Sequence, residues 1–503
     1  MEVYGYAPWG YEGDLVRVEV DLRRGIPGME IVGLPGGAVR EARERIRIAF
    51  GRAGFQFPQD RILINLSPAD LPKSGSGYDL PMALALLQAS GQWKPSFSTI
   101  LAIGELALDS RLRGVPGVLA AAQCCLEQRF SAFAVSGDSV REATCLKGVP
   151  AVGGSDLAGL VNSLAAPPKA SRGTQNSTSP STAVGERWNL RGQQQVVRSL
   201  EVAAAGGHSL LLYGPPGAGK TLAARSLECL LPQLEPEEAV ETTRLWSLAG
   251  ILSREQGLLT TRPFRSPHHH ATAEGLLGGG RNLGPGEVSL AHHGVLFLDE
   301  APEFSPRVLQ ALREPLEQGK VSVVRAGRSA HFPARFQVIL TANACPCGQT
   351  GRERGVCFCS GPEVRRYWDR IGTPLLDRVD LRLFVTPEAP DRILSQESTT
   401  PARLLERIGQ ARKIQRLRGQ SPGQPNAAMT LAELERWCCL DGKSQVYLSD
   451  QASKNDWSTR ALHSLMRVAR TIADLEGMEK VGRIHLEEAF SLRKPKGEEY
   501  WER

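Results

Sequence analysis

The feature that most constrains how this chain folds is a glycine-rich loop between two segments of opposite character. The run Leu210–Tyr213 is apolar and predicts a buried strand, and Leu222–Leu231 favours a helix. The loop between them reads Gly-Pro-Pro-Gly-Ala-Gly-Lys-Thr, the G-x-x-x-x-G-K-T pattern that cradles phosphates. Strand, loop and helix follow in the order that this motif requires. The sequence therefore predicts an α/β nucleotide-binding domain rather than a chance match in a glycine-rich chain.

Each residue type in this loop has a chemical reason. Glycine lets backbone N–H groups converge on phosphate oxygens, and the N-terminus of the following helix adds positive potential. We expect the lysine to reach the β- and γ-phosphates and the threonine hydroxyl to bind Mg²⁺, so the predicted cofactors are ATP and Mg²⁺. The predicted nucleotide-binding residues are Gly214, Pro215, Pro216, Gly217, Ala218, Gly219, Lys220 and Thr221.

A second apolar run ends in two carboxylates, as in a Walker B strand. Gly294–Leu298 predicts a buried strand, and Asp299 and Glu300 follow it directly. Asp299 is expected to bind the nucleotide-associated Mg²⁺ together with Thr221, and Glu300 to polarise the attacking water. Because many strands end in acidic turns, this prediction depends on the phosphate-binding loop elsewhere in the chain.

Three further polar residues are predicted to complete catalysis. Phe336–Thr341 predicts a strand leading to Asn343, whose amide would orient water beside the γ-phosphate; an ordinary turn asparagine is the alternative. Arg378 follows that strand where ring-forming ATPases present an arginine finger to the neighbouring subunit. Arg460 opens a helix and is predicted to be a sensor-2 residue. For both arginines the alternative is a surface charge.

Changes in composition divide the chain of 503 residues into regions. Residues 1–165 alternate strand-like and helix-like segments and predict an α/β or α+β domain. Residues 166–186 are rich in Ser, Thr and Pro and predict a flexible linker. Residues 187–386 hold the nucleotide-binding motifs, and residues 387–503 have the periodicity of an all-helical domain.

Composition also argues against two classes of protein. The sequence shows neither the apolar segment of a secretory signal nor an apolar run long enough to span a membrane, so a cytoplasmic protein without a membrane partner is expected. Ten cysteines, with adjacent pairs at Cys124-Cys125 and Cys438-Cys439, suit reduced thiols rather than a disulfide scaffold. The net charge of +6 permits a polyanionic partner without requiring one.

These motifs together resemble the magnesium-chelatase-like AAA+ ATPases of the ComM/YifB family, and the resemblance covers nearly the whole chain. It implies a P-loop AAA+ core with a helical lid, a homo-hexameric ring, and ATP hydrolysis that drives translocation on single-stranded or branched DNA. It further implies branch migration in homologous recombination and natural transformation. The alternative is a chelatase-like or MoxR-like motor that remodels a protein partner. The specific segments are Gly192-Gln193, the phosphate-binding loop, Arg265–His269, Gly278–Gly280, Pro285–Glu300, Ala344–Gly348 and Leu375–Asp380.

The resemblance also assigns two segments that face DNA. Phe264–Gly286 corresponds to the helix-2 insert, and Gln318–Ser329 to the hairpin before the sensor-1 strand. The residues agree, because Val321–Val324 with flanking basic residues predicts a strand pair whose basic tip follows a phosphate backbone. A solvated hairpin turn is the alternative. The DNA-binding candidates are Lys320, Arg325, Arg328 and Arg265.

Two groups of residues have the composition of metal sites. Two C-x-C pairs lie close together after Asn343, and four thiols there would close a tetrahedral Zn²⁺ site. Zinc ribbons usually use C-x-x-C, so free thiols are the alternative. His268–His270 and His292-His293 are explained more simply as polar loop contacts or DNA-facing groups than as a second metal site. The predicted structural zinc ligands are Cys345, Cys347, Cys357 and Cys359.

The N-terminal segment resembles the Lon-protease-like domain of this family, which has the ribosomal S5 domain 2-like fold. A Lon-type protease needs a serine nucleophile paired with a lysine. In the matching stretch Gly77 stands where the nucleophile would follow Lys73, so a domain without proteolytic activity is predicted. Lys73 and a basic helix are expected to contact DNA, and for the arginines of the helix an ordinary solvated face is the alternative. The arginines of that helix are Arg40, Arg43, Arg45 and Arg47.

Overall fold

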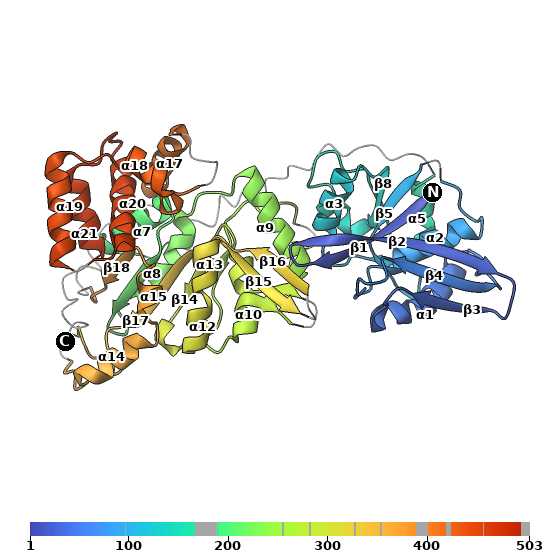
Figure 1. Cartoon of the computed structure of the whole chain (residues 1–503), viewed down its shortest axis with the longest axis horizontal. Helices are drawn as coiled ribbons and strands as arrows, with labels where there is room; N and C mark the ends of the chain where they lie inside the picture. Colours follow the sequence, from blue (N-terminus) through green and yellow to red (C-terminus); the bar gives the residue numbers. More distant parts are fainter. Residues whose placement is uncertain are drawn as a thin grey trace.

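Three regions follow one another along the long axis of the molecule in the computed structural model (Figure 1). An N-terminal region of strands and helices lies at one end, a region built on a parallel sheet lies in the middle, and a group of helices lies at the other end. The structure describes residues 1–95, 97–165, 188, 190–253, 256–280, 283–325, 328–352, 355–388, 401–418, 424–455 and 457–493. The predicted linker, residues 166–186, lies outside these residues.

The N-terminal region is built on a seven-stranded mixed sheet in the order β3-β4-β2-β1-β5-β8-β9. Its strands are β1 (Glu2–Trp9), β2 (Glu12–Arg23), β3 (Gly28–Val32), β4 (Arg61–Ser67), β5 (Thr99–Ala102), β8 (Ala132–Ser136) and β9 (Ala151–Gly154), and β6 (Glu105–Leu106) pairs with β7 (Leu112–Arg113). Its helices are α1 (Gly37–Arg52), α2 (Asp79–Ala89), α3 (Val118–Glu127), α4 (Val140–Ala143) and α5 (Leu157–Ser163). Helix α2 is apolar almost throughout because it is buried against the sheet.

The middle region is a five-stranded parallel sheet in the order β11-β14-β17-β10-β18, consistent with an AAA+ core. Helices cover both faces, so the strands are apolar runs without polar alternation: Leu210 and Leu212 enter one core cluster, and Leu211 and Tyr213 the other. The strands are β10 (Leu210–Gly214), β11 (Phe264–Arg265), β14 (Val295–Leu298), β17 (Gln337–Asn343) and β18 (Leu381–Phe384).

Short helices and two hairpins surround this sheet. The helices are α7 (Gln194–Gly206), α8 (Lys220–Ser226), α9 (Pro236–Ala249), α10 (Ala273–Leu277), α11 (Glu287–Leu290), α12 (Pro306–Ala311), α13 (Arg313–Gln318), α14 (Gly361–Asp369) and α15 (Thr373–Leu376). The hairpins pair β12 (Gly278–Gly279) with β13 (Gly284–Pro285), and β15 (Lys320–Arg325) with β16 (Arg328–Pro333). Helix α7 begins directly after Gln193, which adopts a left-handed conformation with φ of 45°.

The C-terminal region is helical, with α17 (Pro401–Leu417), α18 (Leu431–Trp437), α19 (Gly442–Lys454), α20 (Thr459–Leu475) and α21 (Arg483–Arg493). Helix α20 packs its apolar stripe against α7 and joins the same core cluster as one face of the parallel sheet. Most residues of helix α19 are polar, and its Val446 is exposed. The side chain of Arg460 lies at the start of α20, as expected for a residue that opens a helix.

The N-terminal region contacts the middle region at two places that lie far apart in sequence. The turn between β1 and β2 lies along β16: the Trp9 indole donates to the Ser329 carbonyl at 3.3 Å, and Tyr11 N donates to the His331 carbonyl at 2.9 Å. Helix α9 meets α3 at its C-terminal end, where Gly117 N donates to the Ser247 carbonyl at 3.0 Å. Figure 1 shows α9 and the β15–β16 hairpin beside β1 and β2.

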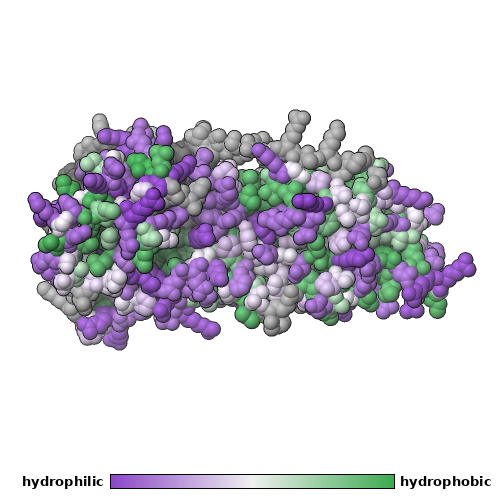
Figure 2. Space-filling model, turned by 45° about the horizontal axis from the view of Figure 1, so that its top comes forward, coloured by the Kyte–Doolittle hydropathy of each residue, from purple (hydrophilic) through white to green (hydrophobic). Residues whose placement is uncertain are grey.

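On the face drawn in Figure 2, hydrophilic and hydrophobic residues are interspersed over all three regions. Within the described part of the chain, the search for a helix with the length and apolarity to cross a bilayer found none.

Candidate nucleotide site, arginine cleft and metal ligands

The carboxyl ends of three neighbouring parallel strands bring the predicted nucleotide-site residues together. The phosphate-binding loop follows β10, Asp299 and Glu300 follow β14, and Asn343 ends β17. Because β17 lies between β10 and β14 in the sheet, its end lies between the loop and the carboxylates. Ligands of open α/β sheets bind at this edge of the strands.

Lys220 is buried and points back across the loop. Its Nζ donates to the carbonyl oxygens of Gly214 at 2.9 Å and Pro215 at 2.8 Å, and to Asn343 Oδ1 at 3.2 Å. Burial lowers the pKa of Lys220 to about 8, against the opposing influence of the Asp299 and Glu300 charges. The Lys220 ammonium and the Asn343 amide therefore lie side by side, where the phosphate oxygens of a bound nucleotide would contact both.

The predicted magnesium ligands are also in contact. Thr221 Oγ1 donates to both carboxylate oxygens of Asp299, at 3.1 and 3.2 Å. Thr341, which the sequence did not single out, donates to Asp299 Oδ1 at 2.5 Å and accepts from Glu300 N at 2.9 Å. A hydroxyl and a carboxylate side by side at the phosphate loop are the oxygen ligands that Mg²⁺ prefers, so these residues fit the ion.

Glu300 is exposed and has a left-handed backbone with φ of 52°, which turns it away from the strand axis. Its amide is held by Thr341, two residues before Asn343 on the same strand and therefore on the same face. The spacing of two residues from Asn343 is the sequence feature that could have identified Thr341 as part of the site. The sequence indicated Gln193 only as part of the segment Gly192-Gln193. In the structure its side-chain amide donates to the carbonyl of Ala218, in the phosphate-binding loop, at 3.0 Å.

Arg378 and Arg460 lie at the opposite edge of the sheet. Both guanidinium groups contact the carboxylate of Glu317 on α13, with Arg460 at 3.4 Å. They line a cleft of about 960 Å³ together with residues that precede the parallel strands, such as Ser209, Gly294 and Phe336. Burial and the positive charge of Arg460 lower the pKa of Arg378. Neither arginine joins Lys220 and Asp299 within one chain.

The DNA-binding candidates lie on the β15–β16 hairpin and on strand β11. Backbone register pairs Arg325 with Arg328 at the turn of the β15–β16 hairpin, and their side chains lie outside the described part of the structure. Lys320, which flanks the strand as expected, is exposed and lies at the end of the hairpin away from its turn. Arg265 is engaged by a two-pronged ion pair with Glu287, at 2.7 and 2.8 Å, and is not a free basic group.

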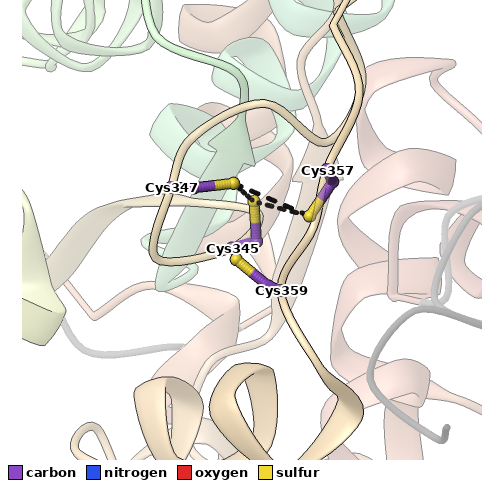
Figure 3. A group of neighbouring side chains, drawn as sticks. All are labelled: Cys345, Cys347, Cys357 and Cys359. Carbon is purple, nitrogen blue, oxygen red and sulfur yellow. Dashed lines mark hydrogen bonds between the residues drawn. The ribbon is translucent and has the colours of Figure 1, made fainter.

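Four thiols converge on the loop after β17 (Figure 3). The Sγ atoms of Cys345, Cys347 and Cys357 are 3.4 to 3.7 Å apart, and those of all four cysteines, with Cys359, lie within 4.8 Å of one another. Tetrahedral zinc with Zn–S bonds of about 2.3 Å requires sulfur atoms about 3.8 Å apart. The residues present therefore fit a single zinc ion.

The paired histidines do not fit a metal in the same way. His292 Nδ1 accepts from Arg335 N at 3.0 Å, so its Nε2 carries the proton and donates to Glu241 at 3.0 Å. Burial lowers the pKa of His292 to about 4, which keeps the ring neutral with both nitrogens engaged. His293 contacts the same carboxylate at 2.7 Å. His292 and His293 therefore have polar partners within the chain, while the ring nitrogens of His268, His269 and His270 lie within 4.8 Å of one another, and for both groups the choice between polar contacts and a metal site stays a prediction.

In the N-terminal region Lys73 was expected at a surface and is instead buried, with Nζ donating to the Pro68 carbonyl. Arg45 is held by the buried carboxylate of Asp79 at 2.7 Å. The expectation of a DNA contact was therefore wrong for Lys73, and Arg45 is already paired. Of the four arginines considered for DNA contact, Arg40, Arg43 and Arg47 are exposed.

Comparison with known proteins assigns relatives to all three regions. Models of magnesium chelatase subunit ChlI match residues 18–139 and 188–393, and the model of its C-terminal part matches residues 397–493. The competence protein ComM of Haemophilus influenzae is 38% identical over 504 residues, which cover 98% of this chain and 97% of ComM. YifB of Salmonella typhimurium is 39% identical over 497 residues, 98% of this chain and 96% of YifB. The 38 kDa magnesium-chelatase subunit of Cereibacter sphaeroides is 25% identical over 325 residues, 60% of this chain and 88% of that subunit.

Proposed function

This chain belongs to the magnesium-chelatase ChlI-like family that includes ComM and YifB, and from that premise we propose that it is an ATP-driven ring motor that translocates on DNA. The family implies ATP hydrolysis. The observation that carries the proposal is the contact network at the carboxyl edge of the sheet, in which Lys220 meets Asn343 and Thr221 meets Asp299. Similarity to a protein named for competence supports a role in natural transformation, with branch migration as the activity.

The residues of this edge divide the work of hydrolysis. Lys220 exchanges its contacts with loop carbonyls for the β- and γ-phosphates of ATP, and Asn343, freed from that ammonium, orients water. Thr221 and Asp299 hold Mg²⁺, whose charge offsets that of the phosphate oxygens. Glu300 polarises the attacking water, and its backbone is fixed by Thr341.

We propose that Arg378 and Arg460 both act on a neighbouring subunit. They lie together on Glu317, at the edge of the sheet away from their own phosphate loop. A ring that stacks this edge on the next chain's carboxyl edge would bring both guanidinium groups to the γ-phosphate, where positive charge stabilises phosphoryl transfer. A homo-hexamer satisfies that geometry with every interface the same.

We assign the N-terminal region, residues 1–165, to a Lon-like domain without proteolytic activity. Gly77 has no hydroxyl and packs against Ile103 and Val115, while the Lys73 ammonium is used by a backbone carbonyl. The Ser76 hydroxyl donates to Glu105 rather than contacting that lysine. Residues 187–386 then form the AAA+ core and residues 387–503 its helical lid, and the four-cysteine loop of the core holds structural zinc.

The deciding experiment compares ATP hydrolysis with and without single-stranded and branched DNA, and follows migration of a synthetic four-way junction. The wild type is expected to be stimulated by DNA and to move the junction, and Lys220→Ala to do neither. Lys443→Ala, which removes an exposed lysine of the C-terminal region, is the matched control. Hydrolysis indifferent to DNA, with a stationary junction, would refute the translocase and favour a chelatase-like or MoxR-like motor acting on a protein.

A further inference from the structure

The four-cysteine loop packs directly onto the outside of the phosphate-binding loop. Gly348 and Gly351 have left-handed backbones, with φ of 71° and 88°, and each faces a proline of the phosphate-binding loop. A Cβ on Gly348 would lie 2.8 Å from Pro216 Cγ, and one on Gly351 would lie 3.2 Å from Pro215 Cδ. Glycine is therefore required at both positions by backbone conformation and by close approach.

The two loops also share one aromatic support. The Trp368 indole donates to the carbonyl of Ala344, at the start of the cysteine loop, at 3.3 Å. The same ring meets Tyr213 edge-on with ring centroids 5.8 Å apart, and Tyr213 is the residue before the phosphate-binding loop. Phe384 contacts Tyr213 at 5.3 Å, and its ring lies 2.6 Å from a Cβ built on Gly351. The cysteine loop therefore packs against the N-terminal half of the phosphate-binding loop and shares its aromatic neighbours.

The sequence of the phosphate-binding loop makes such external support consequential. Gly214, Gly217 and Gly219 all have positive φ, and glycines populate many other conformations when they are not held. Affinity for a ligand rises when the binding conformation is already formed, because less conformational entropy is lost on binding. Four thiols on a short loop restrict its conformation only when they are linked to one another, and a single metal ion bound by all four links them.

We propose that zinc bound by Cys345, Cys347, Cys357 and Cys359 fixes the shape of the phosphate-binding loop, so that ATP affinity depends on zinc occupancy. The contacts of Gly348 and Gly351 with the two prolines transmit the effect. By reciprocity, bound nucleotide also tightens the hold on zinc. The inference rests on the proposed function in one respect, that the phosphate-binding loop binds ATP.

The test uses the full-length protein, a fluorescent ATP analogue to measure Kd, and plasma mass spectrometry to count zinc. Cys347→Ser removes an exposed ligand, and Cys439→Ser, an exposed cysteine of the C-terminal region, is its matched control. We expect one zinc per chain in the wild type and the control, none in Cys347→Ser, and an affinity weaker by about fivefold or more in that variant. Gly348→Ala should weaken binding similarly while keeping its zinc.

A second route avoids dependence on one variant. Zinc is removed from the wild type with a thiol-reactive mercurial and a chelator and is then restored, and the analogue's affinity should fall and recover with the metal. Unchanged affinity after zinc loss, absence of zinc from the purified wild type, or iron in its place would each overturn the proposal. Failure of the zinc-loaded wild type to bind the analogue would be seen separately, and would overturn the ATPase proposal beneath it.

Discussion

Nucleotide affinity should fall steeply at mildly alkaline pH, because Lys220 must be charged to bind phosphate. Burial lowers the pKa of this ammonium to about 8 from its ordinary value of 10.5. Phosphate groups favour the charged form and raise the pKa again when nucleotide binds, so above pH 8 binding must take up a proton. Linkage then predicts that Kd rises about eightfold between pH 7.5 and 9, whereas a lysine with an ordinary pKa would change it by only about 3%.

Isothermal titration with a non-hydrolysable ATP analogue and Mg²⁺ across this pH range measures the effect. Lys220→Arg is the matched control, since guanidinium stays charged and should remove the pH dependence even where its affinity is lower. The side chains whose negative charge opposes the effect of burial on the ammonium are Asp299 and Glu300. A Kd that stays constant from pH 7.5 to 9 in the wild type would refute the reasoning about burial.

Three further outcomes are expected. Thr341→Val should lower kcat by about 10- to 100-fold with little change in nucleotide Kd. The reason is that this hydroxyl donates to the Asp299 carboxylate and accepts from the Glu300 amide, and a hydrogen bond to a charged group contributes about 1.5–3 kcal/mol. Wild-type kcat in steady-state kinetics would contradict this prediction. Arg460→Ala and Lys220→Ala chains, each inactive alone, should recover ATPase activity when mixed, since intact halves then meet across an interface; no recovery would argue that the arginine acts within its own chain. Glu142→Gln should keep or raise the melting temperature at pH 7.5, because burial raises the pKa of Glu142 and disfavours its charged form. Glu142→Ala should instead destabilise the protein by about 1–3 kcal/mol, because the Ser247 hydroxyl and the Leu119 amide lose the carboxylate that accepts from them. Equal melting temperatures for the two variants would contradict this prediction.

The middle region was the most predictable part of the chain because its motifs are strand-end motifs. Each apolar run that leads to Gly214, Asp299 or Asn343 predicts a buried strand. The position of that residue also indicates that the functional group lies at the carboxyl end of the strand. Parallel pairing then brings those ends together without further information. Thr341 escaped notice because a threonine inside an apolar strand has the same pattern as an ordinary β-forming residue.

The contacts between the N-terminal region and the middle region could not be predicted from local sequence patterns. Nothing in Trp9 or Tyr11 indicates that they meet Ser329 and His331, since such pairings depend on how separate units dock. The burial of Lys73 was hidden for a similar reason: a single charge in a loop is normally solvated, and only the surrounding fold supplies the carbonyl that accepts from it. The placement of Arg378 and Arg460 on one carboxylate likewise needed three dimensions.

Leu248, near the end of helix α9, packs into the hydrophobic cluster of the N-terminal region, and Gly117 lies against its side chain. During synthesis that cluster therefore lacks one of its members until the chain has emerged as far as Leu248. At that point more than half of the region that follows residues 166–186 has not yet been made. Folding of the first unit is completed by a helix of the second. A chain cut between them should leave both pieces with an exposed apolar seam, and the intact chain should lose the two units together when heated.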